Sequence, residues 1–101
     1  MEKISINKSE KNNTITINVE GIFDYRVHRD FRNAYRDEKG DYSYVVNLNK
    51  VEYMDSAALG MLLLLREHAG GDAARISITG CRPVVKKTFL IAQFDQLFAL
   101  S

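Results

Sequence analysis

The dipeptide Asp55-Ser56 is the part of this sequence whose residue types and position could carry chemistry. It lies between the apolar run 44–48, which is typical of a buried strand, and a helical pattern over 56–69. The first backbone N–H groups of a helix have no partners inside the helix and attract negative charge. A serine oxygen there can accept one such bond. A phosphate on that oxygen would use the same donors and add about −1.5 to −2 of charge. The position therefore suits a phosphorylation switch.

The same two residues also fit an ordinary helix cap. Serine and aspartate are favoured at the start of a helix, and turns from strand to helix often carry them. A capping box would need Glu or Gln three residues after Ser56, where Leu59 stands instead. This weakens Ser56 as the cap and leaves Asp55 available for that role. The cap and the switch both remain open from these residues alone.

The helical pattern over 56–69 holds more apolar residues than one buried face requires. At about 100° per residue, one face carries Ala58, Met61, Leu62, Leu65 and Ala69. Leu59, Leu63 and Leu64 fall outside that arc. Either neighbouring helices cover these leucines, or some of them stay exposed beside Ser56 as a protein-docking patch. On the second interpretation, the surface at the turn would also carry Met54 and Ala57.

Metal-binding and catalytic chemistry are not expected. His28 and His68 fall in different predicted helices and Cys81 is the only cysteine, so no set of metal ligands is predicted. Ser56 has no identifiable base, so no catalytic nucleophile is predicted. Gly70-Gly71 lacks the Lys-Ser/Thr of a phosphate-binding loop. We therefore expect neither an enzyme nor a cofactor.

The elements that position the dipeptide alternate between strands and helices. Strands that alternate with helices predict a mainly parallel sheet, and the opening pair of strands predicts an antiparallel hairpin with one buried side. The expected strands lie around Ile4 and Ile6 and at 14–20, 44–48 and 75–79. The expected helices are 25–36, 56–69 and 83–92, followed by the apolar tail 97–100, which forms either a short strand or a helical end.

Turn-forming residues mark the ends of these elements. Gly21 and Asp24 break the alternation of the second strand, and Asp24 can cap the helix that follows. Gly70-Gly71 ends the second helix, and Pro83 suits the first position of the third. Helical spacing predicts the following core residues: Val27, Phe31, Ala34, Tyr35, Val84, Val85, Phe89 and Leu90.

Composition excludes several classes of protein. The 101 residues suit one domain, residues 1–101, and 46% apolar residues are enough for a core. The net charge is +1 without a basic stripe, which argues against nucleic-acid binding. The apolar run 61–65 is far shorter than the roughly 20 residues of a membrane span. A lone cysteine fits a reducing compartment, so we expect a cytoplasmic protein.

The run Asp55-Ser56-Ala57-Ala58-Leu59-Gly60 resembles the signature of STAS domains. In the bacterial anti-sigma factor antagonists of that family, it reads Asp-Ser, two small residues, Leu-Gly. The segments 21–24, 76–80, 83–84 and 94–100 also fit the family pattern. Ala57 and Ala58 stand where many members have Ser or Thr and then Gly, which leaves Ser56 as the only hydroxyl at this turn.

The resemblance implies an α/β fold with one mixed, mostly parallel sheet of four or five strands, an N-terminal hairpin, and helices packed mainly on one face. It implies that the unmodified protein binds an anti-sigma factor, often a serine kinase of the GHKL type, and so releases a sigma factor. Phosphorylation of Ser56 would inactivate it, and a metal-dependent serine phosphatase would restore it. The implied partner-binding residues are Met54, Asp55, Ser56, Ala57, Leu59, Gly60, Leu63 and Leu64.

Two further questions stay open from the sequence. The first is whether the chain is instead a structural STAS subunit of a transporter or larger signalling complex that is never phosphorylated; the presence of Ser56 argues against this alternative. The second is oligomeric state, since apolar residues outside the main core could serve a homodimer as well as another partner.

Overall fold

The computed structural model describes residues 3–39 and 41–101, and in them the chain forms one five-stranded sheet with three α-helices. The strands are β1 (Ile4–Ser9), β2 (Thr14–Phe23), β3 (Ser43–Met54), β4 (Ile76–Thr79) and β5 (Ala99–Leu100). The helices are α1 (His28–Asn33), α2 (Ser56–His68) and α3 (Pro83–Ile91). Three short 3-10 helices are η1 (Tyr25–Val27), η2 (Gly71–Ala73) and η3 (Phe94–Gln96). No helix in these ranges is long and apolar enough to cross a membrane.

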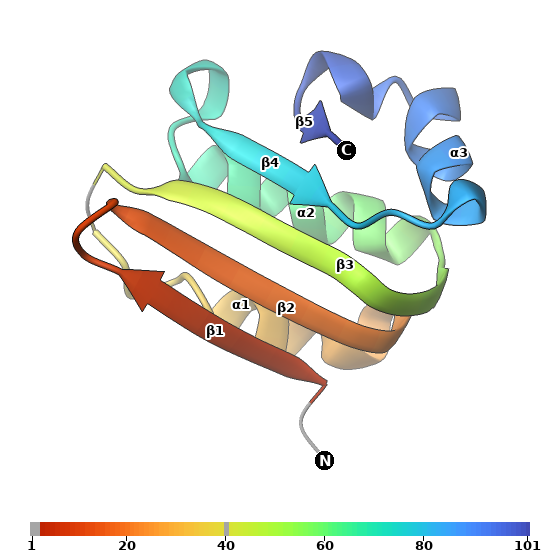
Figure 1. Ribbon diagram of the computed structural model, residues 1–101, viewed down its shortest axis with the longest axis horizontal. Helices are drawn as coiled ribbons and strands as arrows, with labels where there is room; N and C mark the ends of the chain where they lie inside the picture. The colour runs from red at the N-terminus through yellow and green to blue at the C-terminus, as the bar shows by residue number, and fades with distance from the viewer. Residues whose placement is uncertain (1–2, 40) are drawn as a thin grey trace.

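The strands lie side by side in their order along the chain. β1 pairs with β2 in antiparallel fashion, and the three following pairs are parallel. Right-handed crossovers between neighbouring parallel strands, all running in the same direction, place their helices on the same side of the sheet. Figure 1 shows α1 and α2 behind the sheet, with the front face uncovered. The predicted α/β fold is therefore confirmed.

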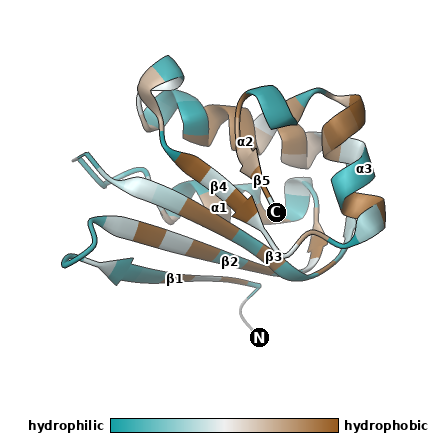
Figure 2. Ribbon diagram, turned by 45° about the horizontal axis from the view of Figure 1, so that its top comes forward, coloured by the Kyte–Doolittle hydropathy of each residue, from teal (hydrophilic) through white to brown (hydrophobic). Residues whose placement is uncertain are grey.

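Side chains alternate between the two faces of the sheet. The buried ones on the helix side are Ile15, Ile17 and Val19 of β2, Tyr44, Val46 and Leu48 of β3, and Ile76 and Ile78 of β4. Figure 2 shows this period of two as brown and pale bands along β2 and β3. The uncovered face is polar: the Asn47 side-chain amide, for example, donates to Asn18 Oδ1 across 3.0 Å.

The two central strands run further than predicted. β2 continues through Gly21 to Phe23, and β3 continues six residues past Leu48 to Met54. The pairing between them shifts register twice, and Gly21 at φ +76° sits at one of these irregularities. Bulges disturb the period of two without ending the ladder. The prediction that Gly21 ends the strand was wrong for this reason.

The predicted helices also differ in detail. The segment 25–36 forms η1 and the short α1, although Val27, Phe31, Ala34 and Tyr35 are all buried as expected. In α3, Val84 and Leu90 were predicted in the core but are 66% and 47% exposed. That helix turns only Val85 and Phe89 inward, since it packs at the sheet margin beside the two-residue strand β5. Within the apolar tail 97–100, the short-strand alternative is the one found, as β5, whereas η3 lies just before the tail.

Gly80 provides a test of this packing. Its φ is +72°, and a Cβ there would lie 2.8 Å from the backbone nitrogen of Asn49. We expect Gly80→Ala to lower the free energy of unfolding by about 2–5 kcal/mol, because left-handed backbone costs about 1–2 kcal/mol and overpacking about 1–3 kcal/mol. Urea denaturation measures the difference.

The matched control is Gly60→Ala, because a Cβ at Gly60 meets nothing within 4 Å. In a helix this change is expected to add about 1 kcal/mol of stability. Equal midpoints for Gly80→Ala and the unmodified protein would contradict the close approach to Asn49.

Candidate functional site

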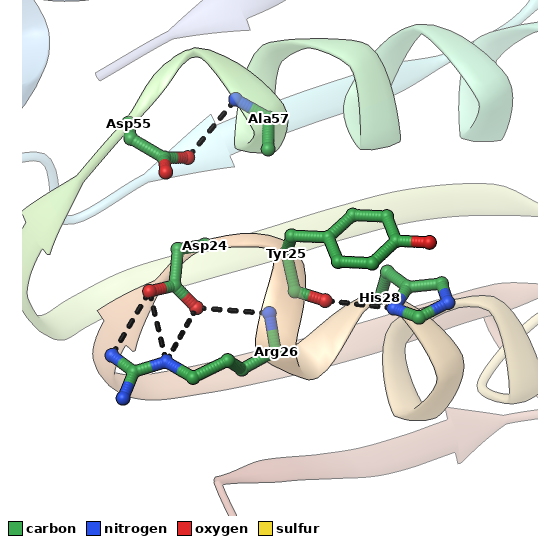
Figure 3. Close-up of polar contacts among 6 residues, drawn as sticks. All are labelled: Asp24, Tyr25, Arg26, His28, Asp55 and Ala57. Carbon is green, nitrogen blue, oxygen red and sulfur yellow. Dashed lines mark hydrogen bonds and ion pairs between the residues drawn. The ribbon is translucent and has the colours of Figure 1, made fainter.

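The turn between β3 and α2 holds the dipeptide singled out by the sequence. Asp55 is the N-cap of α2, with extended backbone at φ −115° and ψ −176°. Its Oδ1 accepts a hydrogen bond from the Ala57 N–H at 2.9 Å, and its carbonyl oxygen accepts one from the Ala58 N–H at 3.1 Å. Figure 3 shows the first of these bonds. The expectation that Asp55 is available as the cap is confirmed.

Because Asp55 is the N-cap, Ser56 does not cap α2. Ser56 is the first residue of α2, one position inside the cap, and its side chain is exposed. The donor that a cap must satisfy first, the Ala57 N–H, is already bonded to Asp55. Ser56 therefore presents a hydroxyl at the surface that the helix start does not need.

The outward side of α2 continues from Ser56 as an apolar surface. At about 100° per residue, Ser56, Gly60, Leu63 and Leu64 share the side opposite Ala58, Leu62 and Leu65. Gly60 is exposed, Leu63 is 39% exposed and Leu64 is 62% exposed. We call Ser56, Gly60, Leu63 and Leu64 the outer face of α2. Ala57 and Leu59 flank it and are half-buried, with Leu59 packed against the core.

Met54 does not belong to this surface. It was predicted to lie there with Ala57, but it is only 7% exposed and is part of the hydrophobic core. The reason is that β3 extends through Met54, which pairs with Phe23 at the end of β2. The neighbouring Tyr53 is 59% exposed instead. The expectation for Met54 was therefore wrong.

A second helix start lies beside the first. Asp24 caps η1 by accepting from the Arg26 N–H at 3.0 Å, and it pairs with the Arg26 guanidinium at 2.9 Å. These hydrogen bonds hold the pKa of the Asp24 carboxyl below its usual range. The Asp55 N–H donates to the Phe23 carbonyl at 3.4 Å, which joins the two turns. Figure 3 shows both turns at the same edge of the sheet.

Tyr25 adds an aromatic surface that sequence reasoning missed. Its side chain is 65% exposed and its ring stacks on His28, with centroids 4.0 Å apart. The His28 ring nitrogen Nδ1 lies 2.7 Å from the Tyr25 carbonyl oxygen. One available signal was topological: the carboxyl ends of neighbouring parallel strands meet at one edge of a sheet, so residues that follow β2 lie near residues that follow β3.

The other titratable groups considered in the sequence lie apart from one another. His68, at the end of α2, places Nε2 2.9 Å from the Glu38 carbonyl oxygen, whereas His28 lies in α1. Cys81 is half-buried, and desolvation raises the pKa of its thiol, which disfavours the reactive thiolate. Within residues 3–39 and 41–101, no group of three or more His, Cys, Asp or Glu side chains is placed to hold a metal ion.

Comparison with known proteins identifies the family. A family model described as "Mlab, STAS domain" matches residues 6–100. A STAS-domain-containing protein of Pseudomonas aeruginosa strain UCBPP-PA14 is 51% identical over 88 residues, which cover 86% of this chain and 87% of that protein.

Two solved structures show the same fold at low identity. The unphosphorylated form of the Bacillus anti-sigma factor antagonist SpoIIAA matches with a TM-score of 0.72 at 17% identity, covering 97% of this chain and 86% of that one. A sulfate transporter family protein of Wolinella succinogenes matches with a TM-score of 0.71 at 11% identity, covering 86% of this chain and 72% of that one. From the family model and the Pseudomonas relative, we conclude that this chain belongs to the STAS domain family.

Proposed function

We propose that this protein is an anti-sigma factor antagonist whose binding is switched off by phosphorylation of Ser56. The observation that carries the proposal is the exposed Ser56 hydroxyl, which lies on the outer face of α2 while Asp55 does the capping. The unmodified protein binds an anti-sigma factor or GHKL-type kinase in the cytoplasm, and a metal-dependent serine phosphatase reverses the modification. This function requires no catalysis by the chain itself.

The position of Asp55 explains how a phosphate would act. A phosphate on Ser56 was expected to use the N–H groups of the helix start, but the Ala57 N–H is already bonded to Asp55 Oδ1, so this donor is not available to neutralise it. About −1.5 to −2 of charge would be added next to the Asp55 carboxylate and would stay on the surface. A partner would have to bury that charge against apolar side chains, which is costly without a matching cation. The phosphate therefore acts by blocking docking, with the fold unchanged.

The outer face of α2 supplies the apolar part of the proposed contact. Leu64 is 62% exposed and Leu63 is 39% exposed, and both lie about two helical turns from Ser56. Gly60 lies between Ser56 and these leucines along the helix. It leaves open space there, where a partner side chain can approach the helix backbone. A partner that covers this face meets both the leucines and the hydroxyl, so it senses the modification directly.

A structural role in a transporter complex is the second candidate. The likeness to the Wolinella sulfate transporter family protein favours it, although that likeness extends only to the fold. In such a role the outer face of α2 would still bind a partner, but Ser56 would carry no phosphate. The two functions therefore differ in the chemistry of Ser56.

Variants at Ser56 test the proposed switch. Ser56→Asp is expected to weaken binding to the anti-sigma factor about tenfold or more, because it places a second carboxylate beside Asp55 at the docking surface. Ser56→Ala is expected to bind as the unmodified protein does and to resist the kinase. Isothermal titration with the purified anti-sigma factor gives both affinities. Equal affinity for the Asp variant and the unmodified protein would argue for the transporter role.

Leu64 tests the docking surface independently of the phosphate. Leu64→Gln is expected to weaken partner binding about tenfold, since losing a central apolar contact commonly costs 1–2 kcal/mol or more. The free energy of unfolding should change by less than about 0.5 kcal/mol, as is usual for exposed positions.

The matched control for this experiment is Ile91→Gln. Ile91 is 74% exposed on α3, outside the outer face of α2, and its replacement should leave binding unchanged. If both variants weaken binding equally, or if neither does, the assignment of the docking surface to α2 is wrong.

A further inference from the structure

Strand β1 is an open edge of the sheet. It pairs with β2 and lies at the end of the strand order, as Figure 1 shows. The Glu20 N–H donates to the Lys3 carbonyl at 2.9 Å, so Lys3 and Glu20 form a hydrogen-bonded pair. In an antiparallel ladder such pairs recur at every second residue. The backbone groups of Ser5 and Asn7 therefore point toward β2, and those of Ile4, Ile6 and Lys8 point outward.

A groove lined by both polar and apolar residues accompanies this edge. A hollow of about 780 Å³ lies between β1 and α1, and its apolar lining is Ile4, Ile6, Ile22, Val27 and Ala34. Helix α1 has only six residues and leaves Ile6 47% exposed. The charged residues at the groove have both signs, Lys3 and Arg26 against Asp24 and Asp30, so the groove does not select a ligand of one charge.

The usual protection of an edge strand is weak in β1. Lysines that project from an edge normally prevent strands of other molecules from pairing with it. The ammonium of Lys8 is instead bound to Glu38 at 2.9 Å and lies 5.0 Å from the centre of the Tyr42 ring. These two contacts hold the Lys8 ammonium beside Glu38 and Tyr42. The outward backbone groups of Ile4 and Ile6 are left accessible.

We propose that β1 pairs antiparallel with β1 of a second copy, so that two sheets join across a two-fold axis at Ser5. This register sets Ile4 opposite Ile6 of the second copy, and Ile6 opposite its Ile4, on the face that carries the groove. A register centred on Lys8 would oppose two lysines, which destabilises a sheet. One centred on Ile6 would set Ile4 against Lys8. The pattern of β1 thus fits another β1, and the contact is isologous, as a two-fold dimer requires.

The proposed dimer leaves the outer face of α2 free. The residues at the proposed dimer contact belong to β1 and to the groove beside α1, and none of them is part of the outer face of α2. The inference therefore does not depend on the switch at Ser56. If both hold, one dimer presents two copies of the Ser56 site.

Disulfide trapping tests the register. In the proposed dimer, the two Ser5 residues form a non-hydrogen-bonded pair with Cα atoms about 4.5 Å apart, which a disulfide can bridge. We expect Ser5→Cys, in a Cys81→Ser background, to form a covalent dimer under mild oxidation. In the same background, Asn7→Cys is the control, because its two copies would be about 14 Å apart along the strands. Trapping through Asn7 in preference to Ser5 would overturn the proposal.

Sedimentation equilibrium tests the contact without new cysteines. The unmodified protein should show a monomer–dimer equilibrium, and Ile6→Lys should weaken it about tenfold or more, because two isoleucine pairs are lost. Ile91→Lys, at an exposed position of α3, should leave the monomer–dimer equilibrium unchanged. Circular dichroism melting should show that Ile6→Lys still folds.

A protein that stays monomeric at every concentration would overturn the proposal. This holds also if its β1 pairs instead with an extended segment of another protein. A dimer that Ile6→Lys leaves intact would overturn it as well.

Discussion

The parallel pairing of β2 with β3 is the contact on which the geometry of the site depends. It continues through two register shifts until Phe23 lies beside Met54, and the Asp55 N–H then donates to the Phe23 carbonyl. Two helix starts are thereby held side by side at the carboxyl edge of the sheet, the position where α/β folds commonly place functional groups. This pairing fixes the turn that carries Ser56 from the β3 side, and the buried side of α2 fixes it from the other.

The division of roles between Asp55 and Ser56 follows from that support. A helix start requires an acceptor for its first N–H groups, and the Asp55 carboxylate supplies it at 2.9 Å. Ser56 is exposed one position inside the cap, and the cap bond is made by Asp55. The helix shows a similar division between its sides: Ala58, Leu62 and Leu65 are buried in the core, whereas the outer face exposes leucines. One element thus anchors the fold and presents a surface.

The sequence was sufficient to predict what short-range patterns control. Alternation located the centre of β2, and the apolar run 44–48 located that of β3. The missing capping box pointed to Asp55, and helical spacing separated the buried from the exposed side of α2. The strand ends were not predictable, because bulges disturb the alternation while the hydrogen bonds continue. For the same reason Met54 was placed on the surface. Val84 was placed in the core because spacing alone does not show that a helix packs at the margin of the sheet.

The central claim is that Ser56 is a reversible phosphorylation site rather than a spare residue beside a cap. Intact-mass and phosphopeptide mass spectrometry of the protein from its native cells tests this most directly. The account predicts one phosphate on Ser56, in a fraction of the protein that changes with growth condition. Finding Ser56 unmodified under every condition would contradict the account and favour a permanent structural role for the outer face of α2.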